Sequence, residues 1–144
     1  MRNAVDELTG LHNKAHAQQA LGRMLQRGGA VAAALIDVDF MTNLNQKLGW
    51  DAGNAVLKGL SALFCTSGII ETARYGSDEF LLLFYNQPRD TVCEYLQQLI
   101  HRVPREKLIC HPEYRRVPVR ISAGVSFGGG SKRSVFSLLK SAEN

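Results

Sequence analysis

An apolar run of strand length that ends directly in aspartates constrains the fold of this chain more than any other segment. Residues 30–36, Ala-Val-Ala-Ala-Ala-Leu-Ile, follow Gly28-Gly29 and precede Asp37-Val38-Asp39. A continuous apolar run of this length, bounded by glycine and by acid, is typical of a β-strand that is buried on both faces. The sequence therefore predicts a buried strand whose far end carries carboxylates.

The periodicity of the remaining sequence predicts the elements around this strand. We expect helices over about 14–27, 52–64 and 91–103, a β-hairpin of 69–75 and 80–85, a strand over 117–127 with its odd-numbered residues buried, and a last helix from about 134. The order α-β-α-β-β-α-β-α favours an α+β fold in which helices pack on a face of one sheet. Two helices before the hairpin and one after it match the split β-α-β arrangement of ferredoxin-like folds.

Length and composition are those of one globular domain. The chain has 144 residues, of which 45% are hydrophobic and 21% charged, as in an ordinary single domain. No apolar run approaches the roughly 18 residues that a membrane span needs, and the first residues hold no apolar signal segment. Three cysteines without a C-x-x-C pair favour a reducing compartment. We therefore expect a single domain over residues 1–144, in the cytoplasm, with no membrane contact by this segment.

The net charge of +4 comes from one basic region. Its six cationic side chains are those of Arg102, Arg105, Lys107, Arg115, Arg116 and Arg120, and Glu106 and Glu113 reduce their sum to +4. Because only Tyr114 adds an aromatic ring to this region, a solvated loop is favoured over a nucleic-acid surface. We expect no nucleic-acid partner.

His12 and His16 lie four residues apart at the start of the first predicted helix. A zinc site needs further ligands, and no other residue has the spacing for one. The sequence therefore predicts no zinc site at this pair.

Two acidic clusters, Asp37-Val38-Asp39 and Asp78-Glu79, each stand at the end of a predicted strand. If the hairpin lies beside the buried strand, the clusters meet. Carboxylates together with a backbone carbonyl suit Mg²⁺, which prefers hard oxygen ligands. The alternative is two ordinary acidic turns on the surface, where aspartate and glutamate usually lie. Spacing alone leaves both interpretations open.

Four segments, in order along the chain, resemble the GGDEF domain family of diguanylate cyclases. Residues 6–14, DELTGLHNK, resemble the opening D-x-L-T-G-L-x-N-R, and residues 35–53 resemble the stretch D-x-D-x-F-K-x-I-N-D-x-x-G-H-x-x-G. Residues 74–80, RYGSDEF, resemble the signature R-Y-G-G-D-E-F, and residues 121–125, ISAGV, resemble a late strand with S-x-G. The resemblance implies a five-stranded, mostly antiparallel sheet with flanking helices, related to the palm of nucleotide cyclases.

The resemblance also implies a reaction: two GTP molecules condense into cyclic di-GMP across a homodimer, with Mg²⁺ or Mn²⁺. By resemblance, Asp37, Asp78 and the Val38 carbonyl would bind the metal. Glu79 would assist metal binding or deprotonate the attacking hydroxyl, and Asn45 would bind the guanine edge. Family members also commonly carry a sensory domain on the N-terminal side of the first of these four motifs.

Several positions of this chain depart from the family pattern. Asn54 replaces an aspartate that accepts hydrogen bonds from guanine, and an amide offers one acceptor and two donors, which suits adenine. In the signature turn, where Gly76 and Ser77 would border a phosphate, Ser77 replaces a glycine. The serine would cost about 1 kcal/mol if its φ were positive, or its hydroxyl would donate to phosphate. Thr42 replaces a lysine, and Trp50 replaces a histidine and is interpreted as a core or rim aromatic.

The chain also ends within the family's last helix, so most of that helix is absent from residues 1–144. These departures leave two functions open. One is an active, homodimeric diguanylate cyclase. The other is a degenerate domain of weak or no activity that binds a nucleotide or a regulatory partner, with altered base selectivity through Asn54.

Overall fold

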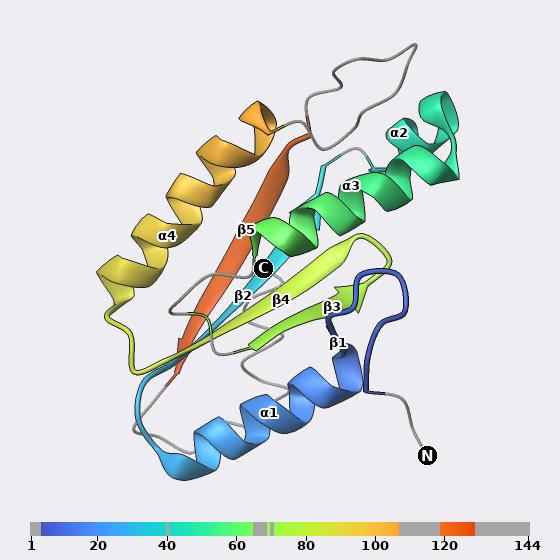
Figure 1. The fold of residues 1–144 in the computed structure, drawn as a ribbon. Coiled ribbons are helices and arrows are strands. Elements are labelled where there is room, and N and C mark those ends of the chain that lie inside the picture. Colours follow the sequence, from blue (N-terminus) through green and yellow to red (C-terminus); the bar gives the residue numbers. More distant parts are fainter. Residues whose placement is uncertain (1–3, 40, 65–68, 70, 107–118, 129–144) are drawn as a thin grey trace.

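The computed structural model describes residues 4–39, 41–64, 69, 71–106 and 119–128. Figure 1 shows a single sheet with helices around it. The elements in chain order are β1 (His12–Asn13), α1 (Lys14–Arg27), β2 (Val31–Val38), α2 (Met41–Leu48), α3 (Trp50–Leu63), β3 (Glu71–Gly76), β4 (Glu79–Tyr85), α4 (Arg89–Arg102), the short 3-10 helix η1 (Val103–Arg105) and β5 (Ile121–Gly128). None of the helices in these described ranges is long and apolar enough to cross a membrane.

The sheet has five strands in the order β1-β3-β4-β2-β5. β1 pairs with β3 in parallel, and the pairs β3–β4, β4–β2 and β2–β5 are antiparallel. The prediction of a mostly antiparallel five-stranded sheet is confirmed. The four longer strands also have the ferredoxin-like order, with β2 between β4 and β5.

Both faces of β2 are covered. Its even-numbered residues pack with α2, α3 and α4 in one apolar cluster, and its odd-numbered residues pack with α1 in a second. In Figure 1, α1 lies apart from α3 and α4, on the other side of the sheet. The prediction that this strand is buried on both faces is confirmed. The prediction that the helices pack on one face of the sheet is correct only in part, because α1 covers the opposite face.

Two elements, α2 and β1, were not predicted from periodicity. α2 buries only Met41 and Leu44, which is too few apolar positions for a periodic pattern. Gly49, with φ of 88°, separates α2 from α3 in a backbone conformation that favours glycine. β1 has two residues, and its pairing with β3 joins segments that are distant in the sequence.

Other boundaries and burials differ in detail. β5 begins at Ile121, later than predicted; residues 117–118 and the predicted helix from residue 134 lie outside the described residues. Ile121 is buried as predicted, but Ala123, Val125 and Phe127 are only partly buried, although they pack against the same cluster. Even-numbered Ser126 is buried, so the predicted strict alternation holds only in part. Trp50 is 74% exposed, so its interpretation as a core aromatic is wrong. It is the first residue of α3, directly after Gly49, and does not belong to the buried face of that helix.

Candidate metal and nucleotide site

The two acidic clusters come together at the end of β2. The β2–β4 register places Asp37 opposite Glu79, and the Val38 amide donates to the Asp78 carbonyl oxygen over 3.1 Å. One carboxylate oxygen from each of Asp37, Asp78 and Glu79 lies within 4.8 Å of the others. Directly opposed residues of an antiparallel pair have neighbouring side chains, so the ladder places Asp37 beside Glu79, and the bond from Val38 holds the Asp78 backbone next to them.

The electrostatics of the cluster favour a cation. Partial desolvation and the negative charges of Asp78 and Asp39 raise the pKa of the Asp37 carboxyl, although a hydrogen bond with Glu79 acts in the opposite direction. A divalent cation would relieve this repulsion, and the donors are the hard oxygens that Mg²⁺ prefers. The residues present therefore fit a Mg²⁺ or Mn²⁺ ion.

Asp39, the second aspartate of the first cluster, is held by β5. The Ser122 hydroxyl donates to Asp39 Oδ1 over 2.7 Å, and the Asp39 amide donates to the Arg120 carbonyl oxygen over 2.9 Å. The structure thus assigns the two aspartates different surroundings, a distinction that spacing alone did not reveal.

The signature turn between β3 and β4 is braced by Arg74. Its guanidinium donates to the Gly76 carbonyl oxygen over 3.3 Å and to the Ser77 carbonyl oxygen over 2.7 Å, and it pairs with Asp6 at 3.3 Å. Burial would raise the pKa of Asp6, but hydrogen bonds from Thr9 and the charge of Arg74 outweigh it and lower the pKa. The opening motif of the chain therefore supports the turn, a link the sequence reasoning missed because it joins distant segments.

Gly76 and Ser77 have different roles in this turn. A Cβ at position 76 would stand 2.3 Å from Glu79 Oε1, so glycine leaves room for the Glu79 carboxylate. Among the described residues, Asn86 is the non-glycine residue with positive φ. The strain anticipated for a positive φ at Ser77 is therefore absent, and the exposed serine replaces glycine without that backbone cost.

Asn45 and Asn54 lie on α2 and α3, the two helices that follow β2. Asn45 Oδ1 is buried and has no hydrogen-bond donor within the described part of the chain. It packs so closely on Gly53 that a Cβ there would stand 1.8 Å away. Asn54 is the next residue on α3 and is half-buried. The sequence did not predict that the Asn45 side chain packs against Gly53.

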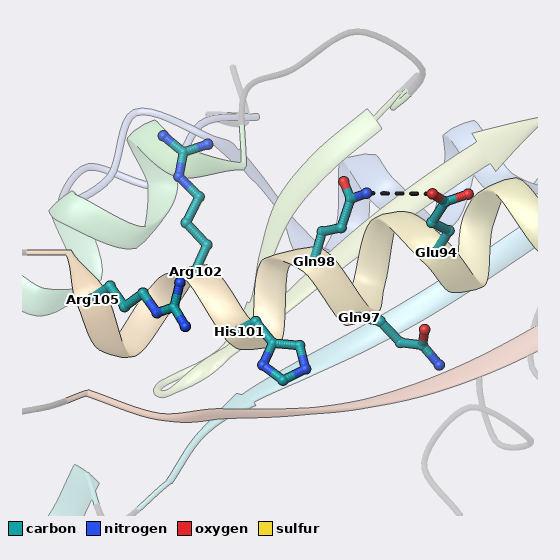
Figure 2. A pocket seen from close by; sticks show the side chains of 6 residues that line it. All are labelled: Glu94, Gln97, Gln98, His101, Arg102 and Arg105. Atoms are coloured by element: carbon teal, nitrogen blue, oxygen red, sulfur yellow. Dashed lines mark hydrogen bonds between the residues drawn. The ribbon is translucent and has the colours of Figure 1, made fainter.

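A shallow hollow lies elsewhere, on the outer side of α4. Its lining residues are Glu94, Gln97, Gln98, His101, Arg102 and Arg105. Figure 2 shows these side chains spread along the helix rather than converging on one point. Arg102 is paired with Glu106 at 2.8 Å while remaining exposed, as expected for a solvated basic region. This hollow shares no residue with the acidic cluster.

The sheet order and the acidic turn can be compared with those of known families. Residues 3–144 match the family described as diguanylate cyclase, GGDEF domain. The chain belongs to the GGDEF domain family.

Relatives with established names match over most of this chain. Response regulator PleD of Caulobacter vibrioides is 28% identical over 144 residues, which cover 96% of this chain and 32% of PleD. Diguanylate cyclase A of Treponema denticola is 30% identical over 111 residues, which cover 76% of this chain and 29% of that protein. The chain thus spans about a third of the length of these relatives.

Solved structures share the fold. The GGDEF domain of DgcB from Caulobacter crescentus, in complex with c-di-GMP, superposes with a TM-score of 0.88 at 20% identity, covering 99% of this chain and 85% of that one. The GGDEF domain of FimX from Pseudomonas aeruginosa gives 0.89 at 19% identity, covering 99% and 90%.

Proposed function

We propose that this domain is a diguanylate cyclase that condenses two GTP molecules into cyclic di-GMP with Mg²⁺ or Mn²⁺. The observation that carries the proposal is the convergence of Asp37, Asp78 and Glu79 at the end of β2. Membership of the GGDEF domain family supports it. A lone acidic turn would support neither metal binding nor a reaction, whereas three carboxylates from two segments do.

In this proposal, Asp37, Asp78 and the Val38 carbonyl hold the metal, with Glu79 beside them. When bound, the ion neutralises phosphate charge and favours ionisation of a hydroxyl near it. Phosphoryl-type transfer needs little covalent help from the protein, so the chain's task is to position the reactants. The rigid β2–β4 ladder and the Arg74 brace supply that positioning.

The bond changes follow from the chemistry of the product. The 3′-oxygen of one GTP forms a bond to the α-phosphorus of the other, and the bond from that phosphorus to the β-phosphate oxygen breaks, releasing pyrophosphate. Glu79, for which Gly76 leaves room, accepts the proton of the 3′-hydroxyl in our proposal. Two such transfers close the ring, so two copies of the domain must face each other as a homodimer.

The base would lie against α2 and α3. Asn45, seated on Gly53, and Asn54 are the residues that we propose contact the guanine edge, with the Gly76–Ser77 turn bordering the phosphates. An amide at position 54 can donate as well as accept, so it offers adenine a partner that a carboxylate would not. This residue favours the second candidate function, a nucleotide-binding regulatory domain with relaxed base choice and weak or no turnover.

The test is turnover and binding of GTP and of ATP, each with Mg²⁺, in the parent and in Asp78→Asn. The cyclase proposal expects cyclic di-GMP formation that Asp78→Asn lowers by about 10-fold or more, because a lost ligand should cost no less than a lost outer partner. Asp90→Asn, an exposed carboxylate in the first turn of α4, is the matched control and should leave turnover unchanged. Binding without turnover supports the regulatory domain instead, and turnover that survives Asp78→Asn refutes the metal assignment.

We further propose the wider setting of the domain. In the full-length protein a sensory domain would precede this domain and control dimer formation. The relative PleD, which is about three times as long as the matched segment, is named a response regulator, and this agrees with the proposal. Its substrate would be GTP, with no nucleic-acid partner, and it would act in the cytoplasm.

A further inference from the structure

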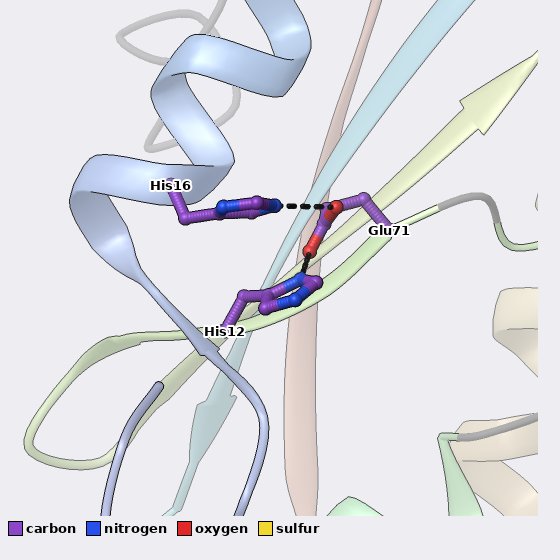
Figure 3. Close-up of side chains that lie close together, drawn as sticks. All are labelled: His12, His16 and Glu71. Carbon is purple, nitrogen blue, oxygen red and sulfur yellow. Dashed lines mark hydrogen bonds and ion pairs between the residues drawn. The ribbon is translucent and has the colours of Figure 1, made fainter. Parts of the chain in front are cut away.

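Two histidines and a glutamate meet at the edge of the sheet opposite β5. His12 lies in β1, His16 in the first turn of α1, and Glu71 begins β3. His12 Nδ1 contacts Glu71 Oε1, and His16 Nε2 lies 3.6 Å from Glu71 Oε2. Figure 3 shows both imidazole rings directed at the one carboxylate. One ligand atom from each residue lies within 4.8 Å of the others.

The backbone holds this arrangement in place. β1 pairs with β3 in parallel, with His12 opposite Ala73, so the strand pairing brings His12 beside the start of β3. The Asn13 side chain accepts from the His16 amide over 3.0 Å and caps α1, which fixes the first turn. The cluster therefore rests on a strand pair and a capped helix rather than on a loop.

Burial and access both suit a bound ion. The Glu71 side chain is 9% exposed, whereas those of His12 and His16 are 44% and 27% exposed. A carboxylate this buried needs a positive partner or a metal. The more exposed imidazoles leave the cluster accessible from solvent.

The two imidazole rings lie side by side against the carboxylate. The rings of His12 and His16 are 3.7 Å apart between centroids and are tilted by 33°. Each ring directs one nitrogen at Glu71, and imidazole nitrogens are the commonest protein ligands of metals.

We propose that His12, His16 and Glu71 form a binding site for a transition-metal ion of the Zn²⁺ class, with water in the fourth position. Two imidazole nitrogens and a carboxylate oxygen are donors that Zn²⁺ takes in open, three-ligand sites. Ligands about 2.0–2.1 Å from a tetrahedral Zn²⁺ lie roughly 3.3 Å apart. The 3.6 Å between His16 Nε2 and Glu71 Oε2 is close to this separation, whereas His12 Nδ1 is in direct contact with Glu71 Oε1 and must move away from it to admit the ion. Mg²⁺, which prefers oxygen, is not expected here, so the site differs in chemistry from the acidic cluster.

A bound ion would join the segment that enters the domain to the sheet. Glu71 lies 59 residues from His12 along the chain, and β3 leads directly into the signature turn. The ion would thus cross-link β1 and the start of α1 to β3. Because it binds the folded chain, it raises the melting temperature, and the increase grows with the logarithm of the ratio of ion concentration to dissociation constant once that ratio exceeds one.

The test is calorimetric titration of Zn²⁺ into the 144-residue chain without a histidine tag, in excess Mg²⁺ to occupy the acidic cluster. We expect one saturable Zn²⁺ per chain and a higher melting temperature. His16→Ala and Glu71→Gln should each weaken Zn²⁺ binding by about 10-fold or more. His101→Ala removes an exposed histidine of α4 and is the matched control, expected to bind like the parent.

Co²⁺ provides a readout on the unaltered chain, independent of any variant. We expect the intense visible absorption of four-coordinate Co²⁺ and its displacement by Zn²⁺. Absence of that band, absence of saturable Zn²⁺ binding, or equal affinity in the parent and in a folded Glu71→Gln variant would each overturn the proposal. Circular dichroism establishes that the variants are folded.

Discussion

Replacing Gly53 by alanine should displace the Asn45 side chain while changing the stability of the domain only slightly. Gly53 is buried in the first turns of α3, and a Cβ there would stand 1.8 Å from Asn45 Oδ1 and 3.0 Å from Met41 Cε. The first distance is far below any tolerated contact, so the Asn45 side chain must rotate away. The second involves the flexible end of a methionine, which can shift.

The energy terms of Gly53→Ala oppose each other. Alanine is better than glycine by about 1 kcal/mol in a helix interior. Moving Asn45 off its preferred rotamer costs about 0.5–1.5 kcal/mol, and no hydrogen bond to Oδ1 from a described residue is lost. We therefore expect the free energy of unfolding to change by less than about 1 kcal/mol. GTP affinity should fall by about 10-fold, the value of one hydrogen bond to a ligand.

A double-mutant cycle with Asn45→Ala isolates the contact. Without the Asn45 amide, Gly53→Ala keeps its helical advantage, so it should raise the free energy of unfolding by about 1 kcal/mol in that background. The assays are urea unfolding of the four proteins and calorimetric titration with GTP and Mg²⁺. Ala55→Gly, at an exposed position of α3, calibrates the glycine–alanine difference in this helix.

Two results would refute this reasoning. One is a Gly53→Ala variant that keeps the parental GTP affinity, because Asn45 would then bind the base without its close packing against Gly53. The other is the same stability change in both backgrounds, which would show that the Asn45 contact costs nothing to displace.

Three further predictions concern the base, the turn and the brace. Asn54→Asp should raise the preference for GTP over ATP by roughly 10-fold in competitive titration, since a carboxylate only accepts. Ser77→Gly should lower the free energy of unfolding by about 0.5–1 kcal/mol in urea, because the serine has no positive φ for glycine to relieve. Asp6→Asn should lower the melting temperature at neutral pH, since its hydrogen bonds with Thr9 and its pairing with Arg74 are weakened. The lowered pKa of Asp6 means that its ionised form stabilises the fold above its unfolded pKa of about 3.9, so the difference from the parent should shrink as pH falls below about 4.

Each of these has a contrary result. Unchanged discrimination in Asn54→Asp would remove this residue from base selection. A more stable Ser77→Gly variant would indicate strain in the turn after all. A melting-temperature difference for Asp6→Asn that stays constant from neutral pH to below about pH 3 would show that the ionised carboxylate is not the stabilising form.

The sheet and its acidic end were predictable because their signals are local. The apolar run of residues 30–36 identifies a buried strand from hydrophobicity alone, and the periodic faces of 14–27 and 91–103 identify helices. The two strands of a hairpin pair with each other, so the turn that carries Asp78 and Glu79 lies at one end of the sheet. Whether that end met Asp37 depended on which strand lies beside β4, a tertiary choice that spacing left open.

The features that sequence reasoning missed are contacts between distant segments. The pairing of β1 with β3 joins segments that are distant in the sequence, and it brings Glu71 beside His12 and His16. The expectation of no zinc site at the histidine pair rested on ligand spacing along the chain, which cannot register a residue on another strand. α2 was missed for a different reason, because eight residues with two buried side chains carry almost no periodicity.

The unbroken register of β2 has a consequence for how this domain can change. β2 pairs with β4 from Val31 to Asp37 and with β5 from Val31 to Val38, without a bulge in either ladder. Inserting or deleting one residue would invert every side chain beyond that point, exchanging the two apolar layers and turning Asp37 away from Glu79. An insertion or deletion within β2 would therefore destroy the core. Sequence changes that keep this fold are expected as single replacements outside the two ladders. Thr42, Asn54 and Ser77, which depart from the family pattern, all stand in helices or in the turn.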